Sequence, residues 1–558
     1  MIWGAFLAFG QILLSFLLKN DPEGFVDTVR TIEVEDLLPS YDFVIVGAGS
    51  AGSVVASRLS ENSEWNVLLV EAGGQETHYS KTPATFAALY NSPYNWNYTT
   101  VRQKKTCSGN DGICPYPRGR SLGGSSATNG MIFLRGYKLD YDRWGQDNPG
   151  WSFEDVHPFF LKSQDNRIEG LKDRGTDGPL TVSTPSYNTK IRDSIIKAGL
   201  EIGMKNEECM NYEKDCIELV PMSIRDGRRC SASRAYLEPV AENRKNLHIL
   251  TNAFVTKITT EGNRATGIDM SVGSGKSVTV KATREVVLSA GAIDSPKVLM
   301  LSGIGPKEHL ESVGIDVVMD LPVGSYLQDH GYTQIPFHVA HGTTDVTDLE
   351  NSMEEYVKSQ TGPLSSNGLE VTAYSTLGQS GPPLNHFCFS TISDTTRKTL
   401  MVGSGVMRPH ASGTVRLSSA DPTAHQLIDI NFFSDQRDYD IQLAGVKEAV
   451  KLIQTSALKE FNATFAPTEM CSDFSDLEKH LKCLISENTE SGHPVGSAKM
   501  GPKDKGGVVD HKLKVYGIEN LRVIDASIAP YVISTNTNAM AVMIGERGAD
   551  IVRHDHAA

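Results

Sequence analysis

At 558 residues the chain is too long for one compact core, so we expect two intertwined domains. A hydrophobic content of 39% with 22% charged residues is ordinary for a soluble enzyme. The formal net charge of −14 provides no basic face, which excludes nucleic acid and anionic membrane surfaces as partners.

The N-terminal segment has the features of a targeting sequence. Residues 1–18 contain no charged side chain, and Lys19 ends the apolar run. We interpret residues 1–19 as a secretory signal peptide, which predicts a secreted protein with no membrane attachment after cleavage. The alternative is an uncleaved anchor, because the run is just long enough to span a bilayer. Secretion is favoured, although neither a basic leading region nor a clean cleavage site flanks the run.

Residues 41–71 have the pattern of a dinucleotide-binding strand–helix–strand unit. Tyr41–Val46 is expected to be a buried parallel strand, Ser53–Leu59 a helix, and Val67–Val70 a second strand that ends at Glu71. Between the first strand and the helix stands a glycine fingerprint, with candidate cofactor-binding residues Gly47, Gly49, Ser50, Ala51 and Gly52. Its glycines permit a tight turn, close approach to a pyrophosphate and close helix–strand packing. Glu71 is placed to bind an adenosine ribose.

The fingerprint alone does not choose among NAD, NADP and FAD, although the carboxylate of Glu71 argues against the 2′-phosphate of NADP. A second small-residue loop, Arg118–Gly130, is suited to lie against a planar or phosphorylated ligand, with Asn129 supplying an amide. By itself that run is interpreted equally well as an ordinary flexible loop. Further strands are expected at Leu247–Leu250, at Val255–Ile258, at Glu285–Ala292 before a glycine turn and, in an antiparallel sheet, at Gly413–Leu417.

Eight cysteines fit an oxidising compartment. Three close pairs permit local disulfides, although spacing leaves the connectivity open: Cys107 and Cys114, Cys209 and Cys216, Cys471 and Cys483. No spacing resembles a zinc site, so no metal is expected. Asn97 and Asn462 begin glycosylation sequons, which are usable only in the secretory route.

Four blocks of sequence, spread over almost the whole chain, resemble the glucose–methanol–choline (GMC) flavoprotein oxidoreductases. They are Gly47–Gly52 with Glu71, then Gly119–Asn129, then Gly291–Gly305, and finally His493–Gly501 with Val523–Ser527 and Asn536. Their order along one chain argues against an accidental match. Smaller segments are similar to the family's connecting segments and have the detail of its animal, arthropod-like branch: Trp151–Val156, Cys230–Leu237 and Gly324–His330.

The resemblance implies an α/β plus α+β fold. A Rossmann-like FAD-binding domain would be assembled from separated segments, beside a substrate domain built on an antiparallel sheet. We therefore expect FAD-binding segments at residues 40–145, 226–330 and 491–558, the last of them also catalytic, and substrate-domain segments at residues 146–225 and 331–490.

The cofactor that the resemblance implies is FAD. Beyond the fingerprint, the residues expected to bind it are Glu71, Ala72, Arg120, Gly123, Gly124, Ser125, Asn129, Gly130, Val255, Ala290, Asp525, Ala526, Asn536 and Thr537. Thr128 occupies the loop position at which some members carry a histidine bonded to the flavin. Because threonine cannot form that bond, we predict non-covalent FAD.

The same resemblance implies an active site. His493 matches the family's catalytic histidine, and Asn536 matches its second catalytic residue, with Asn538 as a chemical rival. Oxidation of an alcohol by hydride transfer to flavin N5 needs a base for the hydroxyl proton, and a neutral histidine suits that role. The amide would orient the substrate.

The predicted function is therefore oxidation of a small-molecule alcohol, with oxygen or a quinone-like carrier as electron acceptor. The alternatives are a hydroxynitrile lyase on the same flavin scaffold and a non-catalytic secreted paralogue. Sugars, ecdysteroids, aromatic alcohols and cyanohydrins are all candidate substrates of the arthropod branch. The sequence does not choose among them and does not indicate an oligomeric state.

Overall fold

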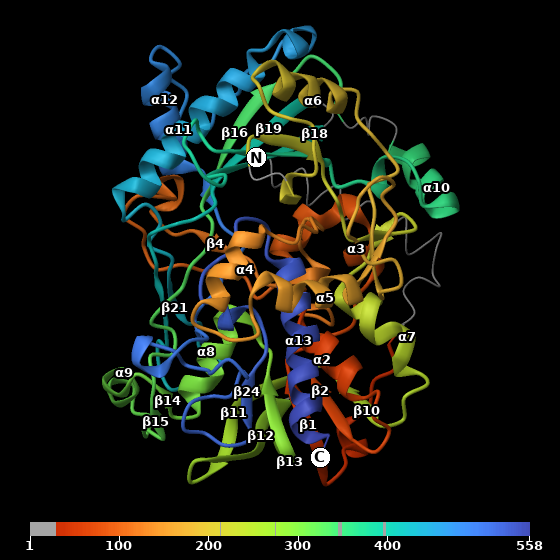
Figure 1. Ribbon diagram of the computed structural model, residues 1–558, viewed down its shortest axis with the longest axis vertical. Helices are drawn as coiled ribbons and strands as arrows, with labels where there is room; N and C mark the ends of the chain where they lie inside the picture. Colours follow the sequence, from red (N-terminus) through yellow and green to blue (C-terminus); the bar gives the residue numbers. More distant parts are fainter. Residues whose placement is uncertain (1–28, 212–213, 274, 344–348, 394–397, 558) are drawn as a thin grey trace.

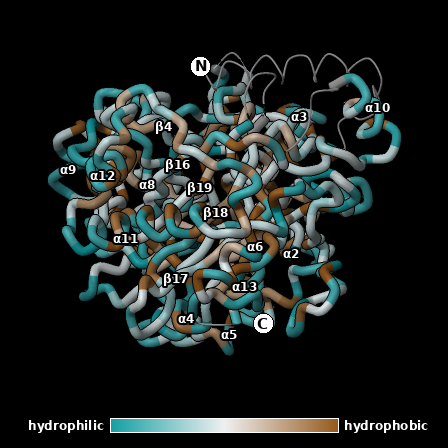
Figure 2. The backbone as a smooth tube through the Cα atoms, turned by 90° about the horizontal axis from the view of Figure 1, so that it is seen from above, coloured by the Kyte–Doolittle hydropathy of each residue, from teal (hydrophilic) through white to brown (hydrophobic). Residues whose placement is uncertain are grey.

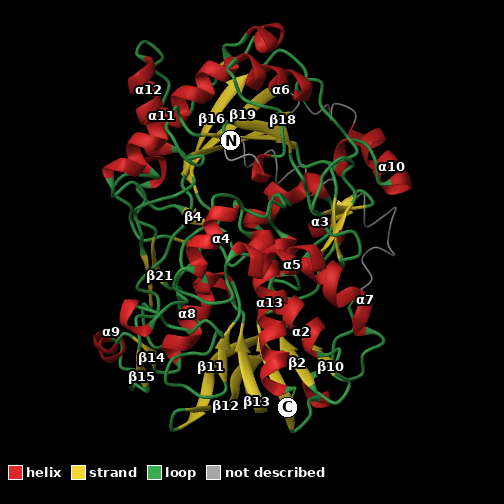
Figure 3. Ribbon diagram, viewed as in Figure 1, coloured by secondary structure: helices red, strands yellow, loops and turns green. Residues whose placement is uncertain are grey.

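The computed structural model describes residues 29–211, 214–273, 275–343, 349–393 and 398–557. The predicted signal peptide, residues 1–19, lies outside these ranges. Two large β-sheets stand at opposite ends of the molecule, one at the bottom and one at the top of Figures 1 and 3. Within the described ranges, no helix has both the length and the apolar character needed to cross a bilayer.

The first sheet is built around the predicted nucleotide-binding unit. Its strand order is β10-β2-β1-β13-β12-β11, and β24 also pairs with β13. The bounds are β1 (Ser40–Val46), β2 (Val67–Val70), β10 (Leu247–Leu250), β11 (Ala253–Glu261), β12 (Arg264–Val272), β13 (Lys276–Leu288) and β24 (Leu521–Val523). Parallel strands β1 and β2 are joined by helix α2 (Gly52–Leu59). The strand–helix–strand prediction is confirmed.

The long strand β13 changes partners along its length. Residues Lys276–Lys281 pair antiparallel with β12, whereas its later residues pair in parallel with β1 and β24. Helix α13 (Asn538–His556) packs against α2 and against α5 (Phe153–Ser163). One layered unit thus collects segments from both ends and the middle of the chain, which confirms the expected assembly of the Rossmann-like fold.

The second sheet is antiparallel and has the order β22-β16-β19-β18-β17-β7, with β23 also paired to β16. Its strands are β7 (Cys216–Leu219), β16 (Tyr332–His338), β17 (Leu369–Ser375), β18 (Asn385–Ser393), β19 (Lys398–Val406), β22 (Thr464–Phe465) and β23 (Thr489–Glu490). Helices α6 (Arg192–Glu201), α11 (Gln436–Ile453) and α12 (Leu477–Glu487) pack against its outer face. Figure 1 shows these helices above the sheet, so its other face is left to line the interior.

The strand expected at Gly413–Leu417 lies in an antiparallel sheet, as predicted, although that sheet is separate from the second large one. The segment forms β20 (Thr414–Arg416), which pairs antiparallel with β21 (Leu427–Asp429) in a separate two-stranded sheet. Val415 is buried between two half-buried neighbours, which explains the alternation in the sequence. Alternation indicates a half-buried strand but does not identify its partner.

The remaining elements are short. The helices are α3 (His78–Lys81), α4 (Lys138–Gly145), α7 (Glu238–Ala241), α8 (Gly291–Leu301), α9 (Lys307–Ser312) and α10 (Leu349–Ser359). The small paired strands are β3 (Tyr98–Thr99) with β4 (Pro115–Tyr116), β5 (Gln164–Asn166) with β6 (Leu180–Val182), β8 (Ile224–Arg225) with β9 (Arg228–Arg229), and β14 (Ile304–Gly305) with β15 (Met319–Asp320). Seen from above, outlying segments such as α10 are mainly hydrophilic, whereas hydrophobic segments lie towards the interior (Figure 2).

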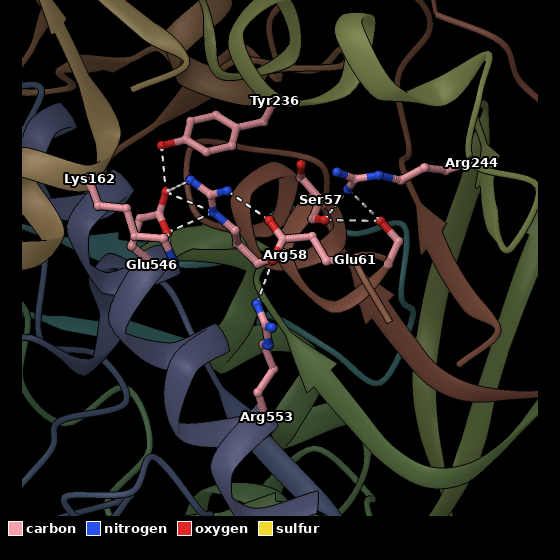
Figure 4. A network of polar contacts seen from close by, with 9 residues as sticks. Ser57, Arg58, Glu61, Lys162, Tyr236, Arg244, Glu546 and Arg553 are labelled. Atoms are coloured by element: carbon pink, nitrogen blue, oxygen red, sulfur yellow. Dashed lines mark hydrogen bonds and ion pairs between the residues drawn. The ribbon is translucent and has the colours of Figure 1, made fainter. Parts of the chain in front are cut away.

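A buried carboxylate ties the C-terminal helix to the rest of the first unit (Figure 4). Glu546 on α13 is fully buried, and its oxygens accept hydrogen bonds from Arg58 Nη2 at 2.7 Å and from Tyr236 Oη at 2.9 Å. Lys162 Nζ lies 3.2 Å from its other oxygen. Three segments that are far apart in the sequence therefore contact the single carboxylate of Glu546. Removing that charge would leave Arg58 without its main partner.

Three disulfides connect cysteines that are close in sequence. They join Cys107 to Cys114, Cys209 to Cys216 and Cys471 to Cys483. Cys230 and Cys388 are free. Each of the three pairs permitted by the sequence spacing is therefore bonded.

Candidate active site

A cavity of about 1500 Å³ extends between the two large sheets. One end is formed by the carboxyl ends of β1 and β2 and by the turn after β13, the place where open α/β sheets bind ligands. The other end is formed by the inner face of the second sheet, with residues from β16, β18 and β19. Pockets for one small molecule are typically about 300–1,000 Å³, so this cavity has room for a dinucleotide and a second ligand.

Two glycine-rich loops meet at the dinucleotide end. Gly47 has a φ of +97°, and a Cβ at this position would lie 2.6 Å from the Ser289 carbonyl oxygen. Gly124 has a φ of +53°, and a Cβ there would lie 2.7 Å from the Cα of Gly49. Only glycine allows this approach of backbone to backbone. The result is an open cradle of main chain, which suits the pyrophosphate of FAD.

Glu71 supports the first of these loops. It is buried at the end of β2, and its carboxylate accepts hydrogen bonds from the backbone N–H groups of Ala48 (2.9 Å) and Gly73 (2.8 Å). Burial raises the pKa of the Glu71 carboxyl to about 7. The side chain therefore holds the glycine loop in place, and its contact with the ribose stays a prediction.

Most residues expected to bind the cofactor line this cavity. They are Gly47, Gly49, Ser50, Ala51, Glu71, Ala72, Gly124, Ser125, Asn129, Gly130, Val255, Ala290, Asp525, Ala526, Asn536 and Thr537. Thr128 lines it as well. Together these residues form a continuous wall from the first sheet towards the second.

Three expected cofactor-binding residues lie outside the cavity lining. Gly52 packs against the loop, where a Cβ would come within 1.9 Å of the Gly47 oxygen. Gly123 adopts a φ of +87° at the turn into the second loop. The Arg120 guanidinium lies 4.6 Å from the ring centroid of Trp96, which does line the cavity. We expect these three residues to act indirectly, because they position the glycine loops and the Trp96 ring.

The two candidate catalytic residues meet at the cavity wall. His493 Nε2 lies 3.0 Å from Asn536 Nδ2, although 43 positions separate the two residues in the chain. Asn538, the rival of Asn536, instead accepts a hydrogen bond from the Ser50 hydroxyl at 2.8 Å. Of the two asparagines, Asn536 is therefore the one beside the histidine. The Asn536 Oδ1 atom is buried and has no hydrogen-bond partner within the described residues.

Burial, together with the neighbours His330 and Arg118, controls the charge of His493. Burial is the main cause that lowers its pKa well below the ordinary value, and His330 and Arg118 act in the same direction. Arg118 is close because its Nη2 donates to the carbonyl oxygen of Gly492 at 3.0 Å. The His493 ring is therefore neutral at neutral pH, which is the state that a base requires.

His330 determines which nitrogen of His493 carries the proton. His330 Nε2 lies 3.2 Å from the carbonyl oxygen of Met407, which can only accept, so Nε2 is protonated. Burial lowers the pKa of His330 to about 4, so its Nδ1 is an acceptor. His493 Nδ1, at 3.0 Å, must then donate to it. The lone pair of His493 is left on Nε2, the atom that faces Asn536.

Asp329, the residue before His330, holds the backbone at His493 in place. The buried carboxylate of Asp329 accepts hydrogen bonds from the His493 N–H at 2.7 Å and from the Tyr116 hydroxyl at 2.5 Å. Asp329 and His330 thus position the main chain and the ring of His493. Sequence reasoning marked Gly324–His330 only as a family-like connecting segment, and an adjacent Asp-His pair was the signal in it.

The comparisons with known proteins identify the class. Models of the GMC oxidoreductase family match residues 41–332, for its N-terminal part, and residues 409–545, for its C-terminal part. The chain belongs to the GMC oxidoreductase family, and it is an FAD-dependent oxidoreductase. The glycine cradle and the continuous cavity wall fit that cofactor.

Its relatives include several animal enzymes. The chain is 36% identical to "Glucose dehydrogenase [FAD, quinone]" of Drosophila melanogaster, over 92% of this chain and 87% of that protein. It is 36% identical to ecdysone oxidase of Bombyx mori, over 93% and 82%. It is 35% identical to human mitochondrial choline dehydrogenase, over 92% and 90%. The expected kinship with the animal branch is confirmed.

Solved structures of fungal enzymes share the fold. A formate oxidase of Aspergillus oryzae superposes with a TM-score of 0.86 at 27% identity, covering 93% of this chain and 99% of that one. A fungal aryl-alcohol oxidase gives a TM-score of 0.79 at 25% identity, covering 94% and 100%. The two-sheet architecture is therefore that of the family.

Proposed function

We propose that this enzyme oxidises a small-molecule alcohol to a carbonyl compound, with His493 as general base and Asn536 as the group that orients the substrate. The observation that carries the proposal is the His493–Asn536 pair, 3.0 Å apart on the wall of the cofactor cavity. Relatives named for glucose, ecdysone and choline support an alcohol as the substrate.

The chemistry is divided between cofactor and protein. Bound FAD supplies the acceptor for the hydride that leaves the carbinol carbon. His493 takes the hydroxyl proton at Nε2, its unprotonated nitrogen. Asn536, whose amide already donates to that nitrogen, is placed to bind the substrate oxygen. Because the pKa of His493 is lowered, its capacity to accept a proton persists at neutral pH and is lost as the pH falls through that lowered value.

Anaerobic mixing of the purified yellow enzyme with a panel of alcohols tests the proposal. We expect one class to bleach the flavin absorbance, and a His493→Ala variant with full FAD content to lose this reaction. Undiminished turnover in that variant would remove His493 from the mechanism. Cyanide release from a cyanohydrin without bleaching would favour a hydroxynitrile lyase, and silence towards every compound would favour a non-catalytic paralogue.

Readmission of air to the bleached enzyme identifies the electron acceptor. Rapid return of the yellow colour assigns an oxidase. A colour that returns only after addition of a quinone assigns a dehydrogenase, the activity named in the Drosophila relative.

We also propose that FAD is held without a covalent bond. Thr128 lines the cavity, and a threonine side chain cannot form the bond that a histidine at this loop position forms with the flavin in some members of the family. Acid precipitation should leave the flavin in the supernatant. Flavin that pellets with the protein would contradict this.

Secretion is proposed on three grounds. The apolar residues 1–18 have a signal-like composition, three disulfides join described cysteines, and both sequon asparagines, Asn97 and Asn462, are exposed. Expression in insect cells should deliver a glycosylated enzyme to the medium. Retention in the membrane fraction would instead support the uncleaved anchor.

A further inference from the structure

A further buried histidine lies next to the cavity wall and has no part in the mechanism above. His386 is on β18, and its side chain is fully buried. Burial lowers the pKa of its imidazole to about 3, so the ring is neutral. A neutral imidazole has one donor and one acceptor nitrogen, and each needs a partner when it is buried. The partners of His386 therefore indicate what the ring does.

The hydrogen bonds of His386 have a fixed direction. Its Nδ1 lies 2.6 Å from the Tyr332 hydroxyl, and its Nε2 contacts the hydroxyl of Thr372. Thr372 also donates to the carbonyl oxygen of Phe387 at 3.2 Å. His386 Nε2–H then donates to Thr372, and the Tyr332 hydroxyl donates to Nδ1. In the reverse arrangement the buried Tyr332 hydroxyl would have no acceptor within the described residues, which is costly.

Tyr332 connects His386 to the catalytic histidine. The centroid of its ring lies 5.8 Å from that of His493 and 6.2 Å from that of His330, both in edge arrangements. On β19, Gly405 is directly opposite Tyr332, and a Cβ there would lie 2.6 Å from a carbon of the tyrosine ring. The ring therefore rests on the strand at Gly405 and packs against both histidines of the active site.

A second contact of His386 leads to the catalytic asparagine. Tyr374 of β17 is directly opposite His386, and the two rings stack with centroids 4.3 Å apart and an interplanar angle of 16°. The Tyr374 hydroxyl lies 2.6 Å from that of Thr535, the residue before Asn536. Tyr374 and Thr535 are both fully buried. His386 thus contacts one tyrosine that packs against His493 and another that binds the chain beside Asn536.

We propose that His386 is a positioning residue for both members of the catalytic pair. Through Tyr332 it holds the ring of His493, and through Tyr374 it holds the chain at Thr535. The catalytic residues are 43 positions apart, so a common support on the second sheet fixes one relative to the other. This inference rests on the proposed alcohol oxidation and adds a residue that acts on it through its neighbours.

Such support matters because hydride and proton transfer depend on geometry. A displacement of about 1 Å in the reacting groups can slow a reaction about 100-fold. The contact between His493 Nε2 and Asn536 Nδ2 is 3.0 Å long, and a displacement of that size would break it. Loss of either tyrosine contact would let one catalytic side chain move relative to the other.

The test compares three substitutions of buried histidines. His386→Leu removes both hydrogen bonds, whereas His386→Asn retains an acceptor near the position of Nδ1 for the Tyr332 hydroxyl. His480→Leu is the matched control, because His480 on α12 is also buried and its ring nitrogens have no hydrogen-bond partner within the described residues. Each variant is checked for FAD content, and denaturant titration gives its stability.

Anaerobic rapid mixing with an alcohol that bleaches the native enzyme separates the limiting rate of flavin reduction from the substrate Kd. We expect the limiting rate to fall about 10- to 100-fold in His386→Leu. It should stay within a few-fold of the native rate in His386→Asn and in His480→Leu. Kd should change little in all three, because the side chains that face the substrate are unchanged.

Tyr332→Phe and Tyr374→Phe keep the rings and remove only the hydroxyls, so they provide the test if His386→Leu does not fold. Each should lower the limiting rate about 3- to 10-fold, the range for one neutral hydrogen bond. In the Tyr332→Phe background, His386→Leu should cause a smaller further loss, because the hydrogen bond to Tyr332 is already absent. Native rates in both phenylalanine variants would refute the inference.

Proton and nitrogen NMR of ¹⁵N-histidine-labelled, FAD-loaded enzyme provides a readout without turnover. The ring signals of His493 should shift in His386→Leu and stay unchanged in His480→Leu, because only the first substitution releases the Tyr332 ring beside His493. Unchanged His493 signals in His386→Leu would refute the positioning role, whatever the activity.

Other outcomes would also overturn the inference. Equal losses of rate in His386→Leu and His480→Leu would show a general effect of removing a buried ring. A His386→Asn variant as slow as His386→Leu would show that the acceptor for Tyr332 has no role. A change confined to Kd would mean that His386 shapes the substrate pocket. Failure of the native enzyme to reduce its flavin with any alcohol would refute the proposed function, and the NMR comparison would then decide the role of His386 separately.

Discussion

The hydrogen-bond chain through His330 makes a sharp prediction, because two substitutions of nearly equal shape should behave differently. His330→Asn retains an acceptor for the His493 Nδ1–H, whereas His330→Leu removes it. In the native chain this contact is 3.0 Å long and buried. A buried donor without a partner costs about 1–3 kcal/mol, and this cost falls on the catalytically competent tautomer. At about 1.4 kcal/mol for each tenfold change, we expect flavin reduction to slow about 10- to 100-fold in His330→Leu.

Rapid-mixing measurement of anaerobic flavin reduction gives the rate, with His330→Asn as the control that should stay within a few-fold of the native enzyme. Nitrogen NMR of ¹⁵N-histidine-labelled protein reports directly which nitrogen of His493 carries the proton. The proton should reside on Nδ1 in the native chain and in His330→Asn, and should redistribute towards Nε2 in His330→Leu. Equal losses in both variants, or an unchanged tautomer in His330→Leu, would refute the reasoning.

Three further outcomes follow from contacts already described. Glu546→Gln should lower the free energy of unfolding by about 3–5 kcal/mol in denaturant titration, because Arg58 and Lys162 lose a fully buried partner. Glu61→Gln, at the half-buried edge of the same network, should lower the free energy of unfolding far less. An equal loss in the two variants would contradict the role of Glu546 as the buried partner of Arg58. Gly124→Ala should abolish FAD binding, read from the ratio of flavin to protein absorbance, because its Cβ would lie 2.7 Å from a neighbouring backbone carbon; normal flavin content would disprove the cradle. The acid limb of flavin reduction should lie below the ordinary histidine pKa of about 6.5, since burial lowers the pKa of His493; a midpoint above that value would contradict the assigned base.

The parts of this molecule that sequence reasoning predicts best are those with local information. The strand–helix–strand unit at Ser40–Val70 is encoded by consecutive residues, because a glycine run between apolar strands has few physical alternatives. The three disulfides likewise join cysteines at short separations. In such cases a pattern and its partner lie within one short segment.

The features that sequence reasoning missed depend on partners far away in the chain. His330 and His493 are 163 positions apart, and the adjacent Asp329 and His330 could mark a polar site but do not indicate that the two histidine rings meet. The pairing of His386 with Tyr374 is a matter of strand register, which is set by the packing of the whole sheet. The strand at Thr414–Arg416 shows the same limit, because its alternation predicts an antiparallel strand but does not indicate that its partner is β21.

The late position of α13 in the sequence has a consequence for folding during synthesis. The helix and the residues just before it, Asn536 and Thr537, are translated long after the glycine loop at Gly47, yet they complete the cavity wall and the charge cluster at Glu546. Strand β24, which pairs with β13, is likewise translated after every other strand of the first sheet. A nascent chain can form the early glycine loop but cannot enclose a cofactor. Flavin capture is thus expected only after α13 has been translated, because until then the first sheet lacks β24 and the cavity lacks part of its wall.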